Sequence, residues 1–160
     1  MCDAIDKNIP IFGSCLGIQV IAKALGGEVI LDNEHRKVGT YFITLNEDGQ
    51  QDPLFSKFPK TFLTQMGHKC RVSVLPEDAV SLASSDLCPV HAFKLKNKMV
   101  YATQFHPELN YHDNVKRLKY YYQNYHHASQ EESLEEMLMK FKEDDTNSTL
   151  LSDFIMLVAG

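Results

Sequence analysis

The order of apolar and polar residues near the start of the chain changes from a strand-like to a helix-like pattern. Residues 9–13, IPIFG, form a short apolar run typical of a buried strand. Four apolar residues then recur at helical spacing: Ile18, Ile21, Ala22 and Leu25. Gly26 and Gly27 follow and end the predicted helix. The pattern therefore predicts a strand-turn-helix unit with Cys15 at the turn.

The middle of the chain is rich in strand signals, and helical signals return towards its end. Apolar or alternating segments predict six further strands, at residues 28–32, 41–46, 62–67, 79–85, 91–96 and 99–105. Polar segments with turn composition separate them, among them NEDGQ at residues 46–50. Helical spacing predicts three later helices, one from Asp113 onwards, one from Ser133 to residue 141, and a last one within residues 146–158. The order of elements favours an α/β fold.

Composition and charge narrow the class of protein. With 160 residues and 44% hydrophobic content, the chain suffices for a single domain with its own core, residues 1–160. A net charge of −5 gives no basic surface for nucleic acid, and neither a signal peptide nor a membrane span is evident. We therefore expect a cytoplasmic protein that binds neither nucleic acid nor membrane.

The cysteines and histidines give no metal-binding pattern. Cys2, Cys15, Cys70 and Cys88 show no metal-ligand spacing, and a domain of this size does not need disulfide bonds. The adjacent His126 and His127, within residues 120–127, lack a fixed cysteine or carboxylate partner. We expect no metal, no cofactor and reduced thiols.

Cys15 lies where a thiol is readily activated. Just before a helix, it is exposed to unpaired N–H groups and to the positive end of the helix dipole, which favour the thiolate. Gly13 and Gly17 suit a tight strand-to-helix turn in which backbones pass closely and a side chain would clash, and Leu16 would direct its N–H towards an oxyanion. The alternative is a buried structural cysteine.

A second motif supplies a base. In residues 101–109, YATQFHPEL, an apolar strand ends at Phe105 and is followed by His106. Glu108 lies two residues further on, and in an extended segment the two side chains would point to a common side. The carboxylate could then hold the imidazole in one tautomer. Cys15, His106 and Glu108 thus form a candidate triad.

Together, FGSCLGIQ and QFHPE resemble the motifs of the class I, triad-type glutamine amidotransferases. The resemblance implies that Cys15 attacks the side-chain amide of glutamine, that His106 acts as base and then acid, and that Glu108 orients His106. It also implies that Gln19 helps to bind the substrate. The implied fold is a three-layer, flavodoxin-like α/β fold with the strand before Cys15 in the centre of the sheet and Cys15 at its carboxyl edge.

The resemblance continues through residues 25–39 and 62–86. It places Gly67, His68, Lys69 and Cys70 on the loop that contacts the substrate. The end of the chain, residues 146–155, resembles the last helix of free-standing relatives of the GMP synthase amidotransferase domain.

Members of this family place several βα units before the nucleophile, whereas here the strand begins about eight residues from Met1. We therefore expect a domain that lacks its N-terminal βα units. Those units would carry a glycine-rich loop with the second oxyanion donor, which would leave Leu16 as the remaining donor.

Three functional hypotheses follow. The first is glutamine hydrolysis that feeds ammonia to a synthetase subunit or another acceptor. The second keeps the thioester chemistry but cleaves a γ-glutamyl bond in a small peptide. The third is a non-catalytic remnant or partner-binding scaffold.

Overall fold

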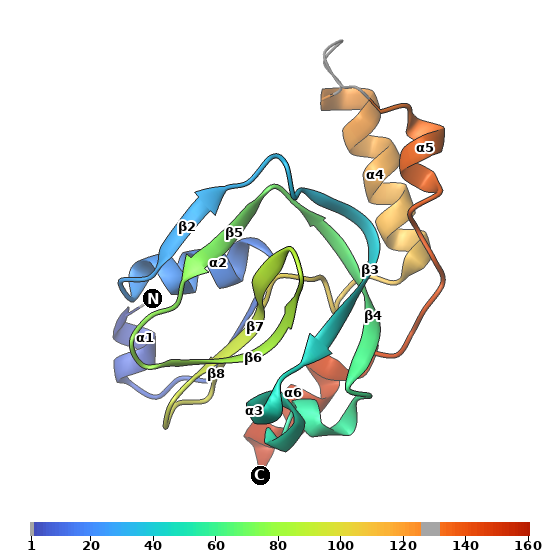
Figure 1. Ribbon diagram of the computed structural model, residues 1–160. Helices are drawn as coiled ribbons and strands as arrows, with labels where there is room; N and C mark the ends of the chain where they lie inside the picture. Colours follow the sequence, from blue (N-terminus) through green and yellow to red (C-terminus); the bar gives the residue numbers. More distant parts are fainter. Residues whose placement is uncertain (1, 126–131) are drawn as a thin grey trace.

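A computed structural model describes residues 2–125 and 132–160 (Figure 1). The helices are α1 (Cys2–Asp6), α2 (Leu16–Ala24), α3 (Glu47–Gln51), α4 (Tyr111–Tyr125), α5 (Leu134–Leu138) and α6 (Leu150–Ala159), and a short 3-10 helix is η1 (Phe55–Lys57). The strands are β1 (Ile11–Ser14), β2 (Glu28–Leu31), β3 (Lys37–Leu45), β4 (Thr61–His68), β5 (Cys70–Val74), β6 (Ala79–Ser85), β7 (Cys88–Leu95) and β8 (Val100–Thr103).

The strands form one large and one small sheet. The large sheet has the order β1-β8-β7-β6-β3-β4, in which β1 and β8 are parallel and the other pairs are antiparallel. Strands β2 and β5 pair antiparallel in the small sheet. The chain passes from the large to the small sheet at Lys69, the one residue between β4 and β5.

Helices and the small sheet cover both faces of the large sheet. Alternate residues of β8 face opposite sides, as strand geometry requires. Tyr101 packs against Phe154 of α6, with ring centroids 5.9 Å apart, whereas Val100 is buried in a second cluster with Ile18 of α2. Figure 1 shows α1, α2 and the small sheet on one side, and α6 on the other. The three-layer α/β arrangement predicted from the sequence is confirmed.

Helices α4 and α5 lie side by side and extend away from the large sheet (Figure 1). Leu118 of α4 and Met137 of α5 belong to a small buried cluster with Phe141, which follows α5. Asn114 of α4 donates a hydrogen bond of 3.0 Å to the side chain of Gln65, which is buried in β4. This bond fixes the base of α4 beside the end of β4.

The structure confirms the strand-turn-helix unit, the six further predicted strands and the helices near the end of the chain. It differs in several places, and α1 and η1 were not predicted. Residues 46–50 do not form a simple turn, because the Asn46 side chain accepts a hydrogen bond from the N–H of Gly49 and caps α3. Strand β5 was not predicted, and α5 ends at Leu138. The strand before Cys15, β1, is an edge strand instead of a central one, since among the described residues it pairs with β8 alone.

Within residues 2–125 and 132–160, no helix combines the length and apolar character needed to cross a membrane.

Candidate functional site

Cys15 occupies a strained turn between β1 and α2. Its φ of 49° and ψ of −93° lie outside the regions that non-glycine residues favour, while its N–H donates a 2.8 Å hydrogen bond to the carbonyl of Thr103 in β8. A methyl group on Gly13 would lie 2.6 Å from Cδ1 of Ile21 and 2.9 Å from the Gly17 carbonyl carbon. The close approach predicted at Gly13 is confirmed. The clash predicted at Gly17 is wrong, because outside its chain neighbours and the backbone of α2 no atom lies within 4 Å of a methyl group there.

His106, Glu108 and Ser14 form a hydrogen-bonded chain. Nδ1 of His106 lies 2.6 Å from Oε1 of Glu108, and the Ser14 hydroxyl donates a 2.8 Å hydrogen bond to Oε2. The side chains of His106 and Glu108 meet through a turn, closed by the Leu109 N–H and the His106 carbonyl, and not through the extended segment that the sequence suggested. Burial raises the pKa of Glu108, but the hydrogen bonds from His106 and Ser14 bring it below its ordinary value.

Cys15 and His106 interact. Burial lowers the pKa of His106, but hydrogen bonds to Cys15 and Glu108 and the negative charges of both outweigh burial and raise this pKa to about 9. The backbone of His106 is fixed by its N–H, which donates a 2.9 Å hydrogen bond to the Gln65 carbonyl. The structure therefore brings Cys15, His106 and Glu108 together at the carboxyl ends of β1 and β8.

Arg117 of α4 also reaches His106, which the sequence did not suggest. Its Nη1 atom lies 2.8 Å from Nε2 of His106. Because a guanidinium has donors only, Nε2 must accept, and the ring proton is then on Nδ1, facing Glu108. The contact thus belongs to the neutral imidazole, whose Nε2 lone pair is bound by Arg117. Negative charge on Cys15 and Glu108 favours the protonated ring, in which Nε2 carries a proton and cannot accept from Arg117.

Gln104 is a second residue that sequence reasoning missed. It is fully buried, and its Nε2 atom donates to the Cys15 sulfur over 3.9 Å. Its N–H donates to the His91 carbonyl at 2.8 Å, which ties the segment after β8 to β7. The sequence did carry a signal for it, namely a glutamine directly before Phe105 in a predicted apolar strand. An amide that is fully buried in such a strand needs polar partners.

Two predicted substrate-binding residues lie on α2. Leu16 opens the helix, in the first turn where N–H groups have no intrahelical acceptor, and its side chain is 67% exposed. Gln19 donates through Nε2 to the Cys70 carbonyl at 3.1 Å. In this structure the Gln19 side chain therefore braces the loop between β4 and β5.

The other predicted substrate-binding residues surround that loop. The Gly67 carbonyl lies 3.9 Å from the sulfur of Cys15. His68 is buried, and its Nδ1 donates to the Cys70 carbonyl at 3.1 Å, whereas Lys69 is exposed at the bend. The loop thus lies next to Cys15, and its contacts with a substrate stay a prediction.

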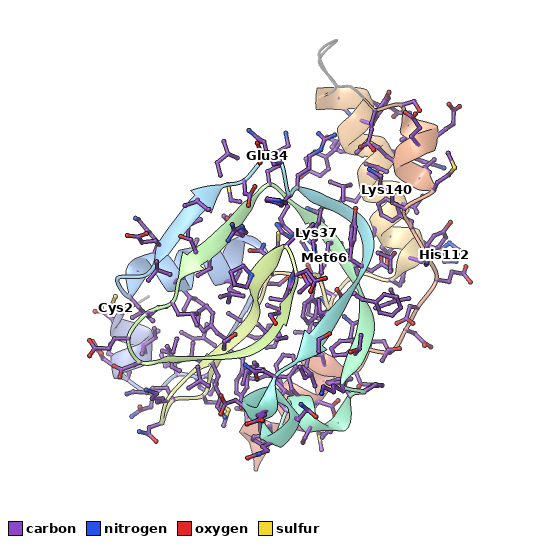
Figure 2. All side chains as sticks on the ribbon, viewed as in Figure 1. Cys2, Glu34, Lys37, Met66, His112 and Lys140 are labelled. Atoms are coloured by element: carbon purple, nitrogen blue, oxygen red, sulfur yellow. The ribbon has the colours of Figure 1, made fainter. Side chains whose placement is uncertain are left out.

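Behind the loop, His68 faces a buried polar group. Its ring centroid lies 6.3 Å from that of His91, whose Nε2 atom is 2.9 Å from the Ser85 hydroxyl. Lys37, labelled in Figure 2, is buried and donates to the same hydroxyl at 2.8 Å. Burial lowers the pKa of His68 to about 4 and that of His91 far below its ordinary range. Both rings are therefore neutral at physiological pH.

A cavity of about 400 Å³ opens beside the loop and α4. Its walls include Gly67, Lys69, Arg117 and Tyr121. Neither Cys15 nor His106 belongs to these walls, but Gly67 and Arg117 each touch the cavity on one side and the candidate triad on the other. The cavity is therefore adjacent to the thiol.

The described part of the chain contains no group of three or more histidine, cysteine, aspartate or glutamate side chains placed to hold a metal ion. The His126–His127 pair lies outside the described residues. The four cysteines, all within the described residues, are free thiols.

The chain is similar in sequence to subunits of GMP synthase from several archaea. The chain is 40% identical over 106 residues to a subunit of the glutamine-hydrolyzing GMP synthase of Methanocaldococcus jannaschii, covering 66% of this chain and 54% of the relative. The corresponding protein of Methanococcus aeolicus is 38% identical over 112 residues, covering 69% of this chain and 57% of the relative. The chain thus spans little more than half the length of these relatives.

Solved structures share the fold. A glutamine amidotransferase of Thermotoga maritima matches with a TM-score of 0.77 at 23% identity, over 97% of this chain and 64% of its own. A glutamine amidotransferase of Methylobacillus flagellatus matches with a TM-score of 0.72 at 24% identity, over 99% of this chain and 64% of its own. The sequence profile of the family described as glutamine amidotransferase class-I matches residues 1–143. The chain therefore belongs to the class-I glutamine amidotransferase family.

Proposed function

We propose that this chain hydrolyses the side-chain amide of glutamine through a thioester on Cys15. The observation that carries the proposal is the strained turn that presents Cys15 to His106, whose Nδ1 atom lies 2.6 Å from Glu108. A thiol, an imidazole and a carboxylate in this order can form a nucleophile, a base and an orienting group. Family membership supports the same chemistry.

In the proposed reaction, Nε2 of His106 takes the proton from the sulfur of Cys15. The sulfur attacks the side-chain amide carbon of glutamine, and the carbonyl oxygen becomes an oxyanion that the Leu16 N–H stabilises. His106 then gives the proton to the departing nitrogen, which leaves as ammonia while the γ-glutamyl thioester remains. A water molecule, deprotonated by His106, releases glutamate and restores the thiol.

The remaining predicted residues act around this centre. Glu108 holds the Nδ1 proton of His106 and stabilises the imidazolium. Gln19, together with Gly67, His68, Lys69 and Cys70, shapes the surface that binds the amino-acid part of glutamine, since the Gln19 amide already braces that loop. The proposed steps call on neither a metal nor a cofactor.

We also propose that the ammonia passes to a separate synthetase subunit. The relatives at 38% and 40% identity are each named as one subunit of GMP synthase, and the chain matches little more than half of each. The expected cytoplasmic location stays a prediction from the sequence.

The test is release of ammonia and glutamate from glutamine by the purified chain, compared with cleavage of a γ-glutamyl dipeptide. We expect turnover of glutamine that Cys15→Ala abolishes, while His112→Ala, which alters an exposed side chain, leaves it unchanged. Preferred cleavage of the dipeptide would instead favour a γ-glutamyl peptidase. If the chain and its Cys15→Ala variant release equal traces of ammonia, the non-catalytic scaffold is correct and the proposal fails.

A further inference from the structure

We propose that Arg117 binds the α-carboxylate of the glutamyl substrate, and that this binding frees the Nε2 atom of His106, which Arg117 occupies in this structure. The inference rests on the proposed function. It assigns a substrate-binding role to α4, outside both sequence motifs, and it couples binding of the substrate to release of the base.

The first support is the competition for one lone pair. Arg117 donates to Nε2 of His106 across 2.8 Å. The same lone pair must accept the proton of Cys15 before the sulfur can attack, and one lone pair cannot hold both. With Arg117 in this position, His106 is oriented by Glu108 but cannot act as a base.

The second support is the cavity on the other side of Arg117. Lys69 and Arg117 both line it, and Arg36, a third cation in its wall, is already paired with Glu132 at 3.2 Å. Among the described residues that line the cavity, none is acidic. Such a wall favours an anion, and a guanidinium matches the two oxygens of a carboxylate better than a single ring nitrogen.

The third support is the position of Gly67 between the thiol and Arg117. Its carbonyl lies 3.9 Å from the sulfur of Cys15, and a methyl group on its Cα would lie 3.2 Å from Nη1 of Arg117. A substrate with its amide at the sulfur can therefore follow the backbone of Gly67 and place its other end at Arg117. A side chain at position 67 would press on the guanidinium.

The fourth support is the way in which Arg117 is held. Asn114, one helical turn earlier, is buried and bonded to Gln65, which fixes the backbone of α4. The guanidinium itself lies over the ring of Tyr121 at 5.7 Å. The long side chain of Arg117 is only partly buried, so its end can turn from His106 to the cavity without movement of the helix.

The direct test measures binding of L-glutamine and of L-glutamine α-amide to Cys15→Ala, which prevents turnover. The α-amide replaces the charged carboxylate by a neutral carboxamide. We expect L-glutamine to bind about ten- to a hundredfold more tightly, and Arg117→Met to reduce this ratio to about one. Arg117→Lys should keep part of the preference, and Lys119→Met, which removes an exposed charge from the same helix, should keep all of it.

A ratio unchanged by Arg117→Met would overturn the inference while leaving glutamine hydrolysis intact. Conversely, a ratio that depends on Arg117 in a chain that never releases ammonia would support the inference and refute the proposed function. If L-glutamine binds to none of the variants, both fail.

A second measurement addresses the release of His106. With Cys15 intact, Arg117→Met should be alkylated at Cys15 by iodoacetamide several-fold faster than the unchanged chain, because Nε2 is then free to take the thiol proton. Slower or equal alkylation, with unchanged thermal stability, would show that Arg117 does not restrain His106.

Discussion

Ser14 and Glu108, 94 residues apart in the sequence, are joined by a 2.8 Å hydrogen bond from the Ser14 hydroxyl to Oε2 of the carboxylate. The other oxygen of Glu108 faces Nδ1 of His106. Ser14, which precedes the proposed nucleophile Cys15, therefore fixes the carboxylate that contacts His106, and this hydrogen bond connects the two sequence motifs.

This bond gives the first prediction. Ser14→Ala should lower kcat/KM for glutamine by about tenfold, because a hydrogen bond to a charged group contributes about 1.5–3 kcal/mol and Glu108 would lose one of its two fixed contacts. Steady-state kinetics measure the effect. Ser73→Ala is the matched control, since that hydroxyl donates to the Glu28 carbonyl in the small sheet. Equal kcat/KM values for the two variants would show that Ser14 does not position Glu108.

The two glycines beside Cys15 should respond in opposite ways. Gly13→Ala should lower the free energy of unfolding by about 1–3 kcal/mol, because the new methyl group would meet both Ile21 and the Gly17 backbone. Gly17→Ala should raise it by up to about 1 kcal/mol, because Gly17 is helical and a methyl group there meets no atom within 4 Å outside its chain neighbours and the backbone of α2. Urea unfolding of both variants measures the difference. A similar loss of stability in both would contradict the geometry of this turn.

Local patterns predicted the strand-turn-helix unit around Cys15 and the pairing of His106 with Glu108. Both depend on neighbours in the sequence, namely a strand that ends, a helix that begins, and two side chains two residues apart. The family resemblance added the loop at Gly67, whose carbonyl the structure places near Cys15. Its role with substrate stays a prediction.

Arg117 could not be predicted in the same way. It lies eleven residues after His106 in a helix whose polar residues look like an ordinary solvated face. The packing of α4, which Asn114 anchors to Gln65, brings it to the imidazole. Strand β5 was missed for a related reason. It is short, and its partner is β2, about 40 residues earlier, so only long-range pairing defines it.

The buried histidine His68 predicts how stability depends on pH. Burial lowers its pKa from 6.5 to about 4 in the folded chain, so between these values the unfolded chain binds more protons. The free energy of unfolding should therefore fall as pH decreases from 6.5 to 4, by about 3 kcal/mol from His68 alone. His91, whose pKa is also lowered by burial, acts in the same direction.

Chemical unfolding at several pH values tests this dependence. His68→Asn should weaken it, because the amide keeps a donor for the Cys70 carbonyl but does not titrate. His112→Asn should leave it unchanged, since the His112 side chain is 79% exposed and lies at the surface, away from the sheets (Figure 2). A steep loss of stability that persists undiminished in His68→Asn would assign the dependence to other groups.

The central claim is that Cys15 is a nucleophile activated by His106, and selective labelling by a glutamine-mimicking electrophile tests it most directly. Mass spectrometry of the labelled peptides compares Cys15 with Cys2, Cys70 and Cys88 at neutral pH. We predict that Cys15 is modified first, that His106→Ala slows its modification, and that His112→Ala does not. Comparable labelling of Cys15 and the exposed Cys2, or an unchanged rate at Cys15 in His106→Ala, would contradict the account.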